Sequence, residues 1–307
     1  KRRKSRDIKK FINFKKNINS IFCDSWKSAE NLIKNKIAKT EKIFCLAHGN
    51  DILIKNNLIK KKRIRKTLSK SSCIIANSYF TKNKIINLGI KSNKIKVIYP
   101  GVDMPDFSSE KNINYFKKYK NFKPILLTMA RLEKRKNHKK IIYAVHDLIK
   151  EFQNLLYLIA GDGPEMKKIS KLIDKLNLKK NVKILGKVNE RDKAFLFKIS
   201  DLHVMPTILD KRSLSIEGFG ISYIEAGLYG IPSISSGLGG TKESVINGKT
   251  GIICNPNNVS SIKDSIKKVL INKKMYKKLS VNSKNFSKKF LWKNIIKNYL
   301  NLIKKDF

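Results

Sequence analysis

Short apolar runs recur along the chain, and the stretches between them are long enough to form helices. In the first third of the sequence these partly β-branched runs lie at 20–24, 42–47, 73–76 and 96–99. Hairpins need only a few connecting residues, whereas parallel strands need long crossovers, and helical patterns at 29–39 and 58–68 would supply them. The alternation predicts an α/β fold with a doubly wound parallel sheet, in which ligands gather at the carboxyl ends of the strands.

A second series of apolar runs follows a segment, 104–123, that is rich in Pro, Ser, Asn and Lys and has no sustained period. The predicted strands of this series are 124–130, 155–160, 182–185, 202–205 and 232–235. A chain of 307 residues with 41% hydrophobic content is long enough for two cores. We therefore predict two Rossmann-like domains, an N-terminal one at 1–110 and a C-terminal one at 111–290.

The formal net charge of +45 would attract phosphate-bearing partners such as nucleic acid, anionic lipid headgroups or nucleotide diphosphates. Most of the charge is Lys, spread along the whole chain, whereas a nucleic-acid surface would be local and richer in Arg and aromatic residues. The composition favours a general bias, and we expect no nucleic-acid partner. No apolar run approaches the roughly 20 residues that span a bilayer, so any membrane contact should be peripheral.

The four cysteines show neither a CxxC pair nor metal-ligand spacing. Three of them, Cys23, Cys45 and Cys73, lie in strand-like runs. This usage predicts reduced, buried thiols in a cytosolic protein.

Two carboxylates flank a glycine turn between Glu217 and Glu225. Gly218 and Gly220 can bring backbone N–H groups close to a ligand, and the helix predicted at 222–229 begins there with its positive end. One carboxylate could accept hydrogen bonds from sugar hydroxyls and the other from ribose hydroxyls, which suits a sugar nucleotide. The alternative is a helix with ordinary solvated acids.

Other polar residues follow predicted strands. His48 could carry a proton, donate a hydrogen bond to a phosphate or sugar, or be structural. Asn77 and Ser78 are expected to cap the next helix. Arg131 and Lys136 lie in a run of charged residues that could bind an anion or could be a solvated surface.

The run Glu-Gly-Phe-Gly-Ile-x-Tyr-Ile-Glu-Ala from Glu217 resembles glycosyltransferase family 4, and Glu217 with Glu225 forms the Glu-x7-Glu signature of retaining GT-B glycosyltransferases. The following Gly-Ile-Pro and Gly239-Gly240-x-x-Glu243 extend the likeness. The resemblance implies two domains facing a cleft and a helix at 291–307 that returns to the N-terminal domain. No glycine-rich loop precedes Asp24, so the N-terminal domain is expected to be truncated.

The same resemblance implies a role for each candidate. Arg131 and Lys136 would bind the diphosphate, Val188 the base and Glu225 the ribose. Glu217 with Gly218, Phe219 and Gly220 would hold the sugar and phosphate, and His48 would contact the sugar, so that His48 and Glu217 form the catalytic pair. The leaving phosphate would deprotonate the acceptor, while Glu217 positions the sugar. No metal or other cofactor is expected.

The implied substrates are a nucleotide sugar, either GDP-mannose or a UDP-sugar, and a hydroxyl of a glycan or lipid-linked acceptor in cell-envelope synthesis. The run from Arg212 is similar to phosphatidylinositol mannosyltransferases and favours GDP-mannose. We expect a cytoplasmic enzyme, with contact to an anionic membrane at its inner face as an option. A nucleic-acid-binding protein and another GT-B enzyme, a sugar-nucleotide epimerase or a phosphorylase, remain as alternatives.

Overall fold

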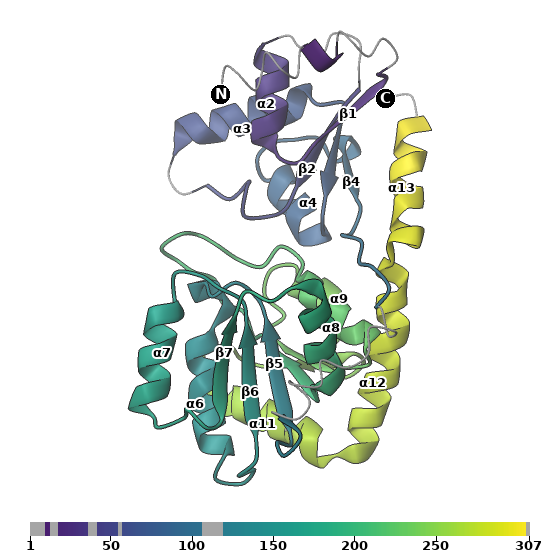
Figure 1. Cartoon of the computed structure of the whole chain (residues 1–307). Helices are drawn as coiled ribbons and strands as arrows, with labels where there is room; N and C mark the ends of the chain where they lie inside the picture. The colour runs from purple at the N-terminus through teal and green to yellow at the C-terminus, as the bar shows by residue number, and fades with distance from the viewer. Residues whose placement is uncertain (1–9, 13–17, 36–41, 55–56, 106–118, 305–307) are drawn as a thin grey trace. The chain divides into compact units, whose positions relative to one another are not determined.

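The computed structural model describes residues 10–12, 18–35, 42–54, 57–105 and 119–304. The chain divides into two compact units, each built from separate segments (Figure 1). Unit 1 comprises Lys1–Pro100, Lys211–Phe219 and Lys293–Phe307, and unit 2 comprises Gly101–Asp210 and Gly220–Trp292. The boundary predicted at residue 110 lies outside the described residues.

Unit 1 is built on a parallel sheet in the order β1-β2-β3-β4. Its elements are β1 (Ser20–Cys23), α2 (Trp26–Lys34), β2 (Lys42–Ala47), α3 (Leu58–Lys70), β3 (Cys73–Ala76), α4 (Tyr79–Ile86), η1 (Ser92–Lys94), β4 (Ile95–Val97) and most of α13 (Trp292–Lys304). Each strand pairs with the next one in sequence. The predicted parallel arrangement of this half of the chain is confirmed.

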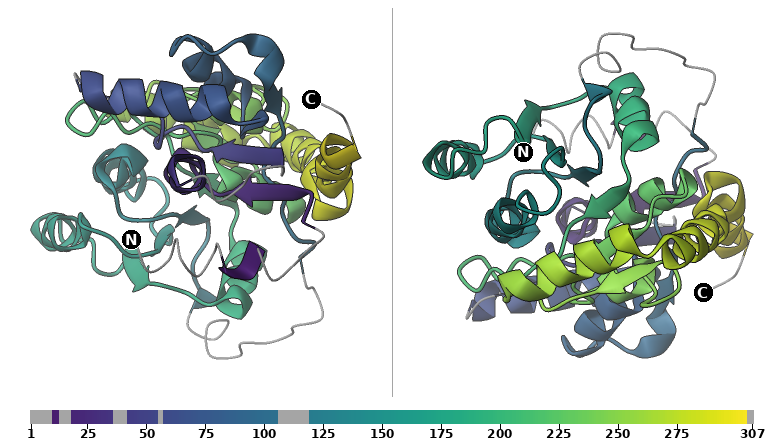
Figure 2. Two further views of the ribbon diagram at one scale, coloured as in Figure 1. Left: turned by 90° about the horizontal axis from the view of Figure 1, so that it is seen from above. Right: turned by 90° about the horizontal axis from the view of Figure 1, so that it is seen from below.

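Alternate residues of β2 face two different cores, as the period of a strand requires. Ile43 and Cys45 pack with residues of α2 and α3, whereas Phe44 packs with Ile295 and Leu302 of α13. Helices therefore cover both faces of the sheet, and the last helix of the chain supplies one cover (Figure 2).

Unit 2 contains a six-stranded parallel sheet in the order β10-β9-β8-β5-β6-β7. Its elements are β5 (Ile125–Met129), η2 (Lys134–Lys136), α6 (His138–Leu148), β6 (Leu156–Ala160), α7 (Met166–Lys175), β7 (Val182–Gly186), α8 (Glu190–Ile199), β8 (Leu202–Val204), α9 (Ile221–Leu228), β9 (Ser233–Ser235), α10 (Thr241–Ser244), β10 (Gly251–Ile253), α11 (Val259–Ile271), α12 (Lys273–Ser287) and η3 (Lys288–Phe290). Counted along the chain from the other edge, the order is 3-2-1-4-5-6, which is that of the dinucleotide-binding Rossmann fold.

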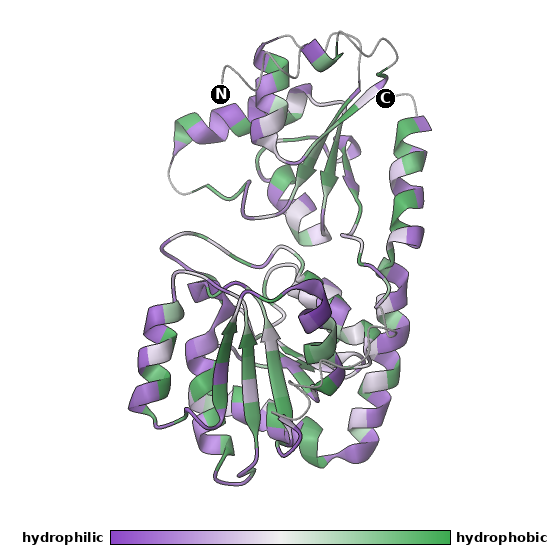
Figure 3. Ribbon diagram, in the orientation of Figure 1, coloured by the Kyte–Doolittle hydropathy of each residue, from purple (hydrophilic) through white to green (hydrophobic). Residues whose placement is uncertain are grey.

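The central strands β5 and β6 consist mainly of apolar, buried residues, as a sheet with helices on each side requires (Figure 3). Leu126 and Tyr157 face a core shared with α6, α7 and α11. Ile125 and Leu158 face a second core shared with α8 and α9. This arrangement confirms the doubly wound architecture predicted from the alternation of runs.

Gly251 pairs with Ser233 of β9 and begins β10. The structure corrects one helix boundary. The helix predicted at 29–39 begins earlier, at Trp26, and ends at Lys34. The helix implied at 291–307 corresponds to α13, and η3 with Leu291, whose backbone is extended, separates it from α12.

All four cysteines are unpaired and buried, as predicted. Burial raises the pKa of Cys23 to about 11 and that of Cys254 to about 12. These thiols are therefore protonated at neutral pH and are poor nucleophiles.

Candidate active site

The switch point of unit 2 lies between β5 and β8, where the strand order reverses. Ligands of open α/β sheets bind outside the carboxyl ends of the strands at such a point. The loop after β5 carries Arg131 and Lys136, and β8 is followed by Met205. The backbone N–H of Ile208 donates to the carbonyl of Arg135 at 2.8 Å, so the two loops are in contact.

Asn137 anchors the loop that carries Lys136. Its backbone is left-handed at φ 63°, and its side-chain amide donates to the carbonyls of Pro206 at 3.0 Å and Pro256 at 2.8 Å. Lys136 itself is buried, and its Nζ lies 3.5 Å from the Met205 sulfur. The sequence thus places a desolvated cation at the switch point. Arg131, in contrast, is exposed and pairs with Glu133 at 3.0 Å.

The N-terminus of α9 reaches the same methionine. Gly220 caps this helix at φ 94°, and a Cβ there would lie 2.5 Å from the Tyr223 ring. The Tyr223 hydroxyl donates to the Met205 carbonyl, and Ser222 Oγ lies 3.9 Å from the Met205 sulfur. Met205 therefore contacts both the Lys136 ammonium and the first turn of α9, where backbone N–H groups have no partner within the helix. The Lys136 ammonium and the backbone N–H groups at the start of α9 together form a positively polarised site suited to an anion, called the diphosphate seat below.

Glu225 lies further along α9 and forms an ion pair that the sequence did not reveal. Its carboxylate accepts from Lys193 of α8 at 2.8 Å, and Lys193 also pairs with Glu190 at 2.6 Å. Burial acts to lower the pKa of Lys193, but the hydrogen bonds to both carboxylates outweigh it and raise the pKa. In a chain so rich in lysine, the sequence alone did not distinguish Lys193 as a partner of Glu225.

A cavity of about 430 Å³ opens beside this ion pair. Glu225 and Lys193 line its polar side, and Phe197 and Tyr229 line its apolar side. Charged and aromatic side chains that line the same cavity can hold a flat polar ring.

The loops after β5, β6 and β7 are packed closely together. Gly161 has φ 144°, donates its N–H to the Gly186 carbonyl at 2.7 Å, and has no room for a side chain because a Cβ would lie 2.0 Å from the Ala130 carbonyl. Val188 follows this junction and packs, half-buried, against the core of α8. Arg131 follows the carboxyl end of β5 and Val188 that of β7, and the two strands lie on either side of β6.

In unit 1 the structure brings His48 and the glycine turn together. A Cβ on Gly218 would lie 2.2 Å from the His48 carbonyl, and Ser78 Oγ donates to the Gly218 carbonyl at 2.7 Å. Phe219 packs against Tyr99, with 5.2 Å between the ring centroids. Glu217 precedes Gly218 and is half-buried. Residues 170 positions apart in the sequence are thus neighbours, as the prediction for one sugar-contacting set requires.

Ser78 caps α4 as predicted, since its hydroxyl accepts from the N–H of Thr81 at 3.1 Å. Asn77 has a different role from the one expected. Its amide donates to the His48 carbonyl at 3.4 Å, and its side-chain oxygen accepts from the Thr81 hydroxyl at 2.7 Å.

Two regions of sequence match known families. The model described as Glycosyl transferases group 1 matches residues 110–286, more than half of the chain, and the model described as Glycosyltransferase Family 4 matches residues 9–105. The chain belongs to the glycosyl transferases group 1 family.

Proteins similar to this chain include an uncharacterized glycosyltransferase of Methanocaldococcus jannaschii, MJ1178, which is 31% identical over 266 residues, 86% of this chain and 68% of that protein. A GDP-mannose-dependent alpha-(1-6)-phosphatidylinositol monomannoside mannosyltransferase of Mycobacterium tuberculosis is 21% identical over 243 residues, 78% of this chain. The chain spans 63% of the length of that mannosyltransferase.

Similarity to solved structures identifies the fold of the chain. The Anabaena protein Alr3699/HepE in complex with UDP-glucose superposes with a TM-score of 0.82 and 20% identity, covering 96% of this chain and 81% of that one. The two parallel-sheet units therefore correspond to a GT-B glycosyltransferase fold.

Two negative findings concern the described part of this group 1 chain. It contains no cluster of three or more His, Cys, Asp or Glu side chains that could hold a metal ion. Within the same residues, every helix is too short or too polar to cross a bilayer.

Proposed function

We propose that the chain is a retaining hexosyltransferase that moves a hexose from a nucleotide-diphosphate sugar to a hydroxyl acceptor. The observation that most supports this proposal is the position of the buried Lys136 side chain. Its ammonium contacts Met205, and Met205 in turn contacts the first turn of α9. A leaving diphosphate gains negative charge as the glycosidic bond breaks, and a fixed cation with aligned N–H groups stabilises that charge. The seat lies at the switch point, where this type of sheet binds nucleotides.

The other candidate residues bind different parts of the donor. Arg131, once it leaves Glu133, can turn its guanidinium to the diphosphate, and Glu225 accepts from the ribose hydroxyls while Lys193 holds its carboxylate. Val188 borders the base. His48 and Glu217 contact the sugar, together with the Gly218 and Gly220 backbone. No metal takes part, because the ammonium and guanidinium neutralise the leaving group.

The anomeric configuration is kept because the leaving phosphate deprotonates the acceptor on the face that it departs from. Glu217 orients the sugar and does not attack it. The donor is GDP-mannose or a UDP-sugar, in line with the GDP-mannose-dependent relative and the neighbour solved with UDP-glucose. The acceptor is a glycan or lipid-linked hydroxyl in cell-envelope synthesis.

The test combines binding with product analysis. Thermal-shift titration with GDP, UDP and ADP should show stabilisation by GDP or UDP, and the matching sugar nucleotide should then support transfer in the presence of EDTA. Proton NMR of the product should show the anomeric configuration of the donor. An inverted product would reject retention, and hydrolysis or epimerisation without transfer to any hydroxyl acceptor would reject the transferase.

Contact with an anionic membrane would bring a lipid-linked acceptor to the enzyme, and α3 has the required chemistry. Leu58 and Ile59 are 80% and 76% exposed at the start of the helix. Lys61, Lys62 and Lys66 are exposed on the same helix, which contains no acidic residue. Apolar side chains that insert beside a basic surface bind anionic bilayers.

Liposome co-sedimentation tests this contact. The protein should bind vesicles that contain anionic lipid more tightly than neutral vesicles. Leu58→Ser with Ile59→Ser should weaken binding by at least about tenfold, since each buried methylene contributes about 0.8 kcal/mol and the loss of two already corresponds to that factor. Ile271→Ser, at another exposed apolar residue, is the matched control. Equal binding to both vesicle types would exclude the proposed contact.

A further inference from the structure

One short stretch at the start of α2 contacts the His48 loop twice. The carbonyl of Asp24 lies 2.9 Å from Nε2 of His48, and the indole N–H of Trp26 donates to the carbonyl of Asp51 at 2.9 Å. Asp51 in turn accepts from the backbone N–H of His48 through its side chain at 2.9 Å. The loop is therefore held at His48 and again three residues later.

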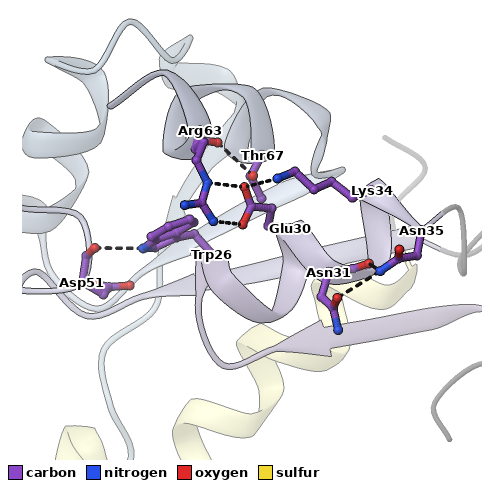
Figure 4. A network of polar contacts seen from close by, with 8 residues as sticks. All are labelled: Trp26, Glu30, Asn31, Lys34, Asn35, Asp51, Arg63 and Thr67. Atoms are coloured by element: carbon purple, nitrogen blue, oxygen red, sulfur yellow. Dashed lines mark hydrogen bonds and ion pairs between the residues drawn. The ribbon is translucent and has the colours of Figure 1, made fainter. Parts of the chain in front are cut away.

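Trp26 is itself held in place by α3. It is 2% exposed, and the Arg63 guanidinium lies 5.6 Å from the centre of its ring. Arg63 also makes two hydrogen bonds to Glu30, at 2.9 and 2.6 Å, as Figure 4 shows. Hydrogen bonds from Arg63 lower the pKa of Glu30, so this carboxylate stays ionised at neutral pH. The planar, bidentate pair fixes the guanidinium over the indole.

The Asp24 contact decides which ring nitrogen of His48 carries the proton. A carbonyl oxygen only accepts, so Nε2 must donate, and in the neutral ring Nδ1 is then the nitrogen with the lone pair. Within the described residues, Nδ1 has no hydrogen-bond partner. It is the ring atom that can accept a hydrogen bond from a sugar hydroxyl.

We propose that Trp26 is a positioning residue for His48: its indole N–H holds the loop so that Nε2 donates to Asp24 and Nδ1 is presented to the sugar. This inference depends on the proposed function for the statement that the ligand of Nδ1 is a sugar. The placement of the imidazole and its tautomer can be measured without any substrate.

The experiment compares Trp26→Phe with Lys34→Ala in the full chain. Phe keeps an aromatic ring under Arg63 and removes the N–H donor, whereas Lys34→Ala removes a different contact to Glu30, at 3.2 Å, and leaves the indole intact. In ¹⁵N-histidine spectra, with His48→Gln to assign the signal, the wild type and Lys34→Ala should show the Nε2–H tautomer. Trp26→Phe should show a mixture of tautomers.

The kinetic readout separates positioning from folding. Trp26→Phe should lower kcat by about 10- to 100-fold, the effect of misplacing a reacting group by about 1 Å. Its affinity for UDP or GDP should stay unchanged, because unit 2 supplies the diphosphate seat. A kcat and a tautomer that both match the wild type would overturn the proposal, and so would a loss of nucleotide affinity equal to the loss of kcat.

Failure of the proposed function has a different signature. If the wild type transfers no sugar and binds no nucleoside diphosphate, while Trp26→Phe still changes the His48 tautomer, the transferase assignment is wrong and the positioning role of Trp26 is supported. If the tautomer is insensitive to Trp26 in a chain that does transfer sugar, only the positioning role is wrong.

Discussion

At the residue scale, the environment of Lys136 separates it from the many other lysines of the chain. The sequence predicted its role only through a resemblance, because nothing in a run of charged residues distinguishes a buried ammonium from a solvated one. Burial of Lys136 and of Asn137 depends on loops from β8 and β10, more than 60 residues away. Lys193 was missed for the same reason, since its two carboxylate partners become visible only when α8 and α9 are packed.

Replacement of Lys136 should remove the diphosphate seat and leave the fold intact. Lys136→Met keeps the apolar stem beside Met205 and should lower kcat by about 10²- to 10³-fold, the range for loss of one charge-stabilising group. Affinity for UDP or GDP should fall as well. Lys139→Met, at an exposed lysine of α6, is the control. Steady-state kinetics and calorimetry provide the measurements, and equal activity of the two variants would contradict the assignment.

His203 should make the fold sensitive to acid. It is fully buried, neither ring nitrogen has a partner among the described residues, and burial, with a smaller effect of Lys136, lowers its pKa from 6.5 to about 3. Burial likewise lowers the pKa of His138, to about 4. The unfolded chain therefore binds more protons below pH 6.5, and the stability present above that pH is lost as the pH falls towards these values.

His203→Phe tests this sign. The ring would pack against Tyr223, whose centroid is 5.2 Å from that of His203, without an ionisable group. The free energy of unfolding of the wild type, measured with urea, should fall by about 3 kcal/mol per buried histidine between pH 7 and pH 4. In the variant it should fall by one such contribution less. His146→Gln, at a partly exposed histidine, should follow the wild type. Parallel curves for wild type and His203→Phe would show that His203 is not responsible.

At the element scale, most strands of the two sheets were predictable because they are short apolar runs between long polar connections. Elements whose definition depends on partners were not. β10 has three residues and becomes a strand only through pairing with β9. Hydropathy alone does not show the break between α12 and α13, because Phe290 and Leu291 within the break are buried as well. Only the resemblance began the last helix at 291.

Asn137 joins three elements, and its loss should be costly. Asn137→Ala leaves two buried carbonyls, of Pro206 and Pro256, without their donor and places a Cβ in the left-handed region. Each unpaired group costs about 1–3 kcal/mol, so the free energy of unfolding should fall by about 2–5 kcal/mol. Asn177→Ala is a matched control, since Asn177 also has a left-handed backbone, φ 55°, but is exposed. Similar losses in both variants by urea denaturation would assign the effect to backbone strain alone.

At the scale of the whole molecule, 68 basic residues face 23 acidic ones, and this imbalance should oppose folding through repulsion. The excess of charge can be counted in the sequence, but its effect on stability cannot, since some of the described lysines have carboxylate partners in the structure. Raising NaCl from about 0.05 M to about 0.5 M shortens the Debye length to less than half. The thermal midpoint should therefore rise, and a chloride-independent midpoint would show that the charges are already compensated.

The segmented construction of unit 1 also sets the order in which the protein can mature during synthesis. Ile295 and Leu302, near the C-terminus, fill a core whose other walls come from the first hundred residues. The ribosome therefore completes every segment of unit 2 before it has synthesised the helix that closes this core of unit 1. Unit 1, although its largest segment precedes unit 2 in the chain, therefore reaches its native state after unit 2.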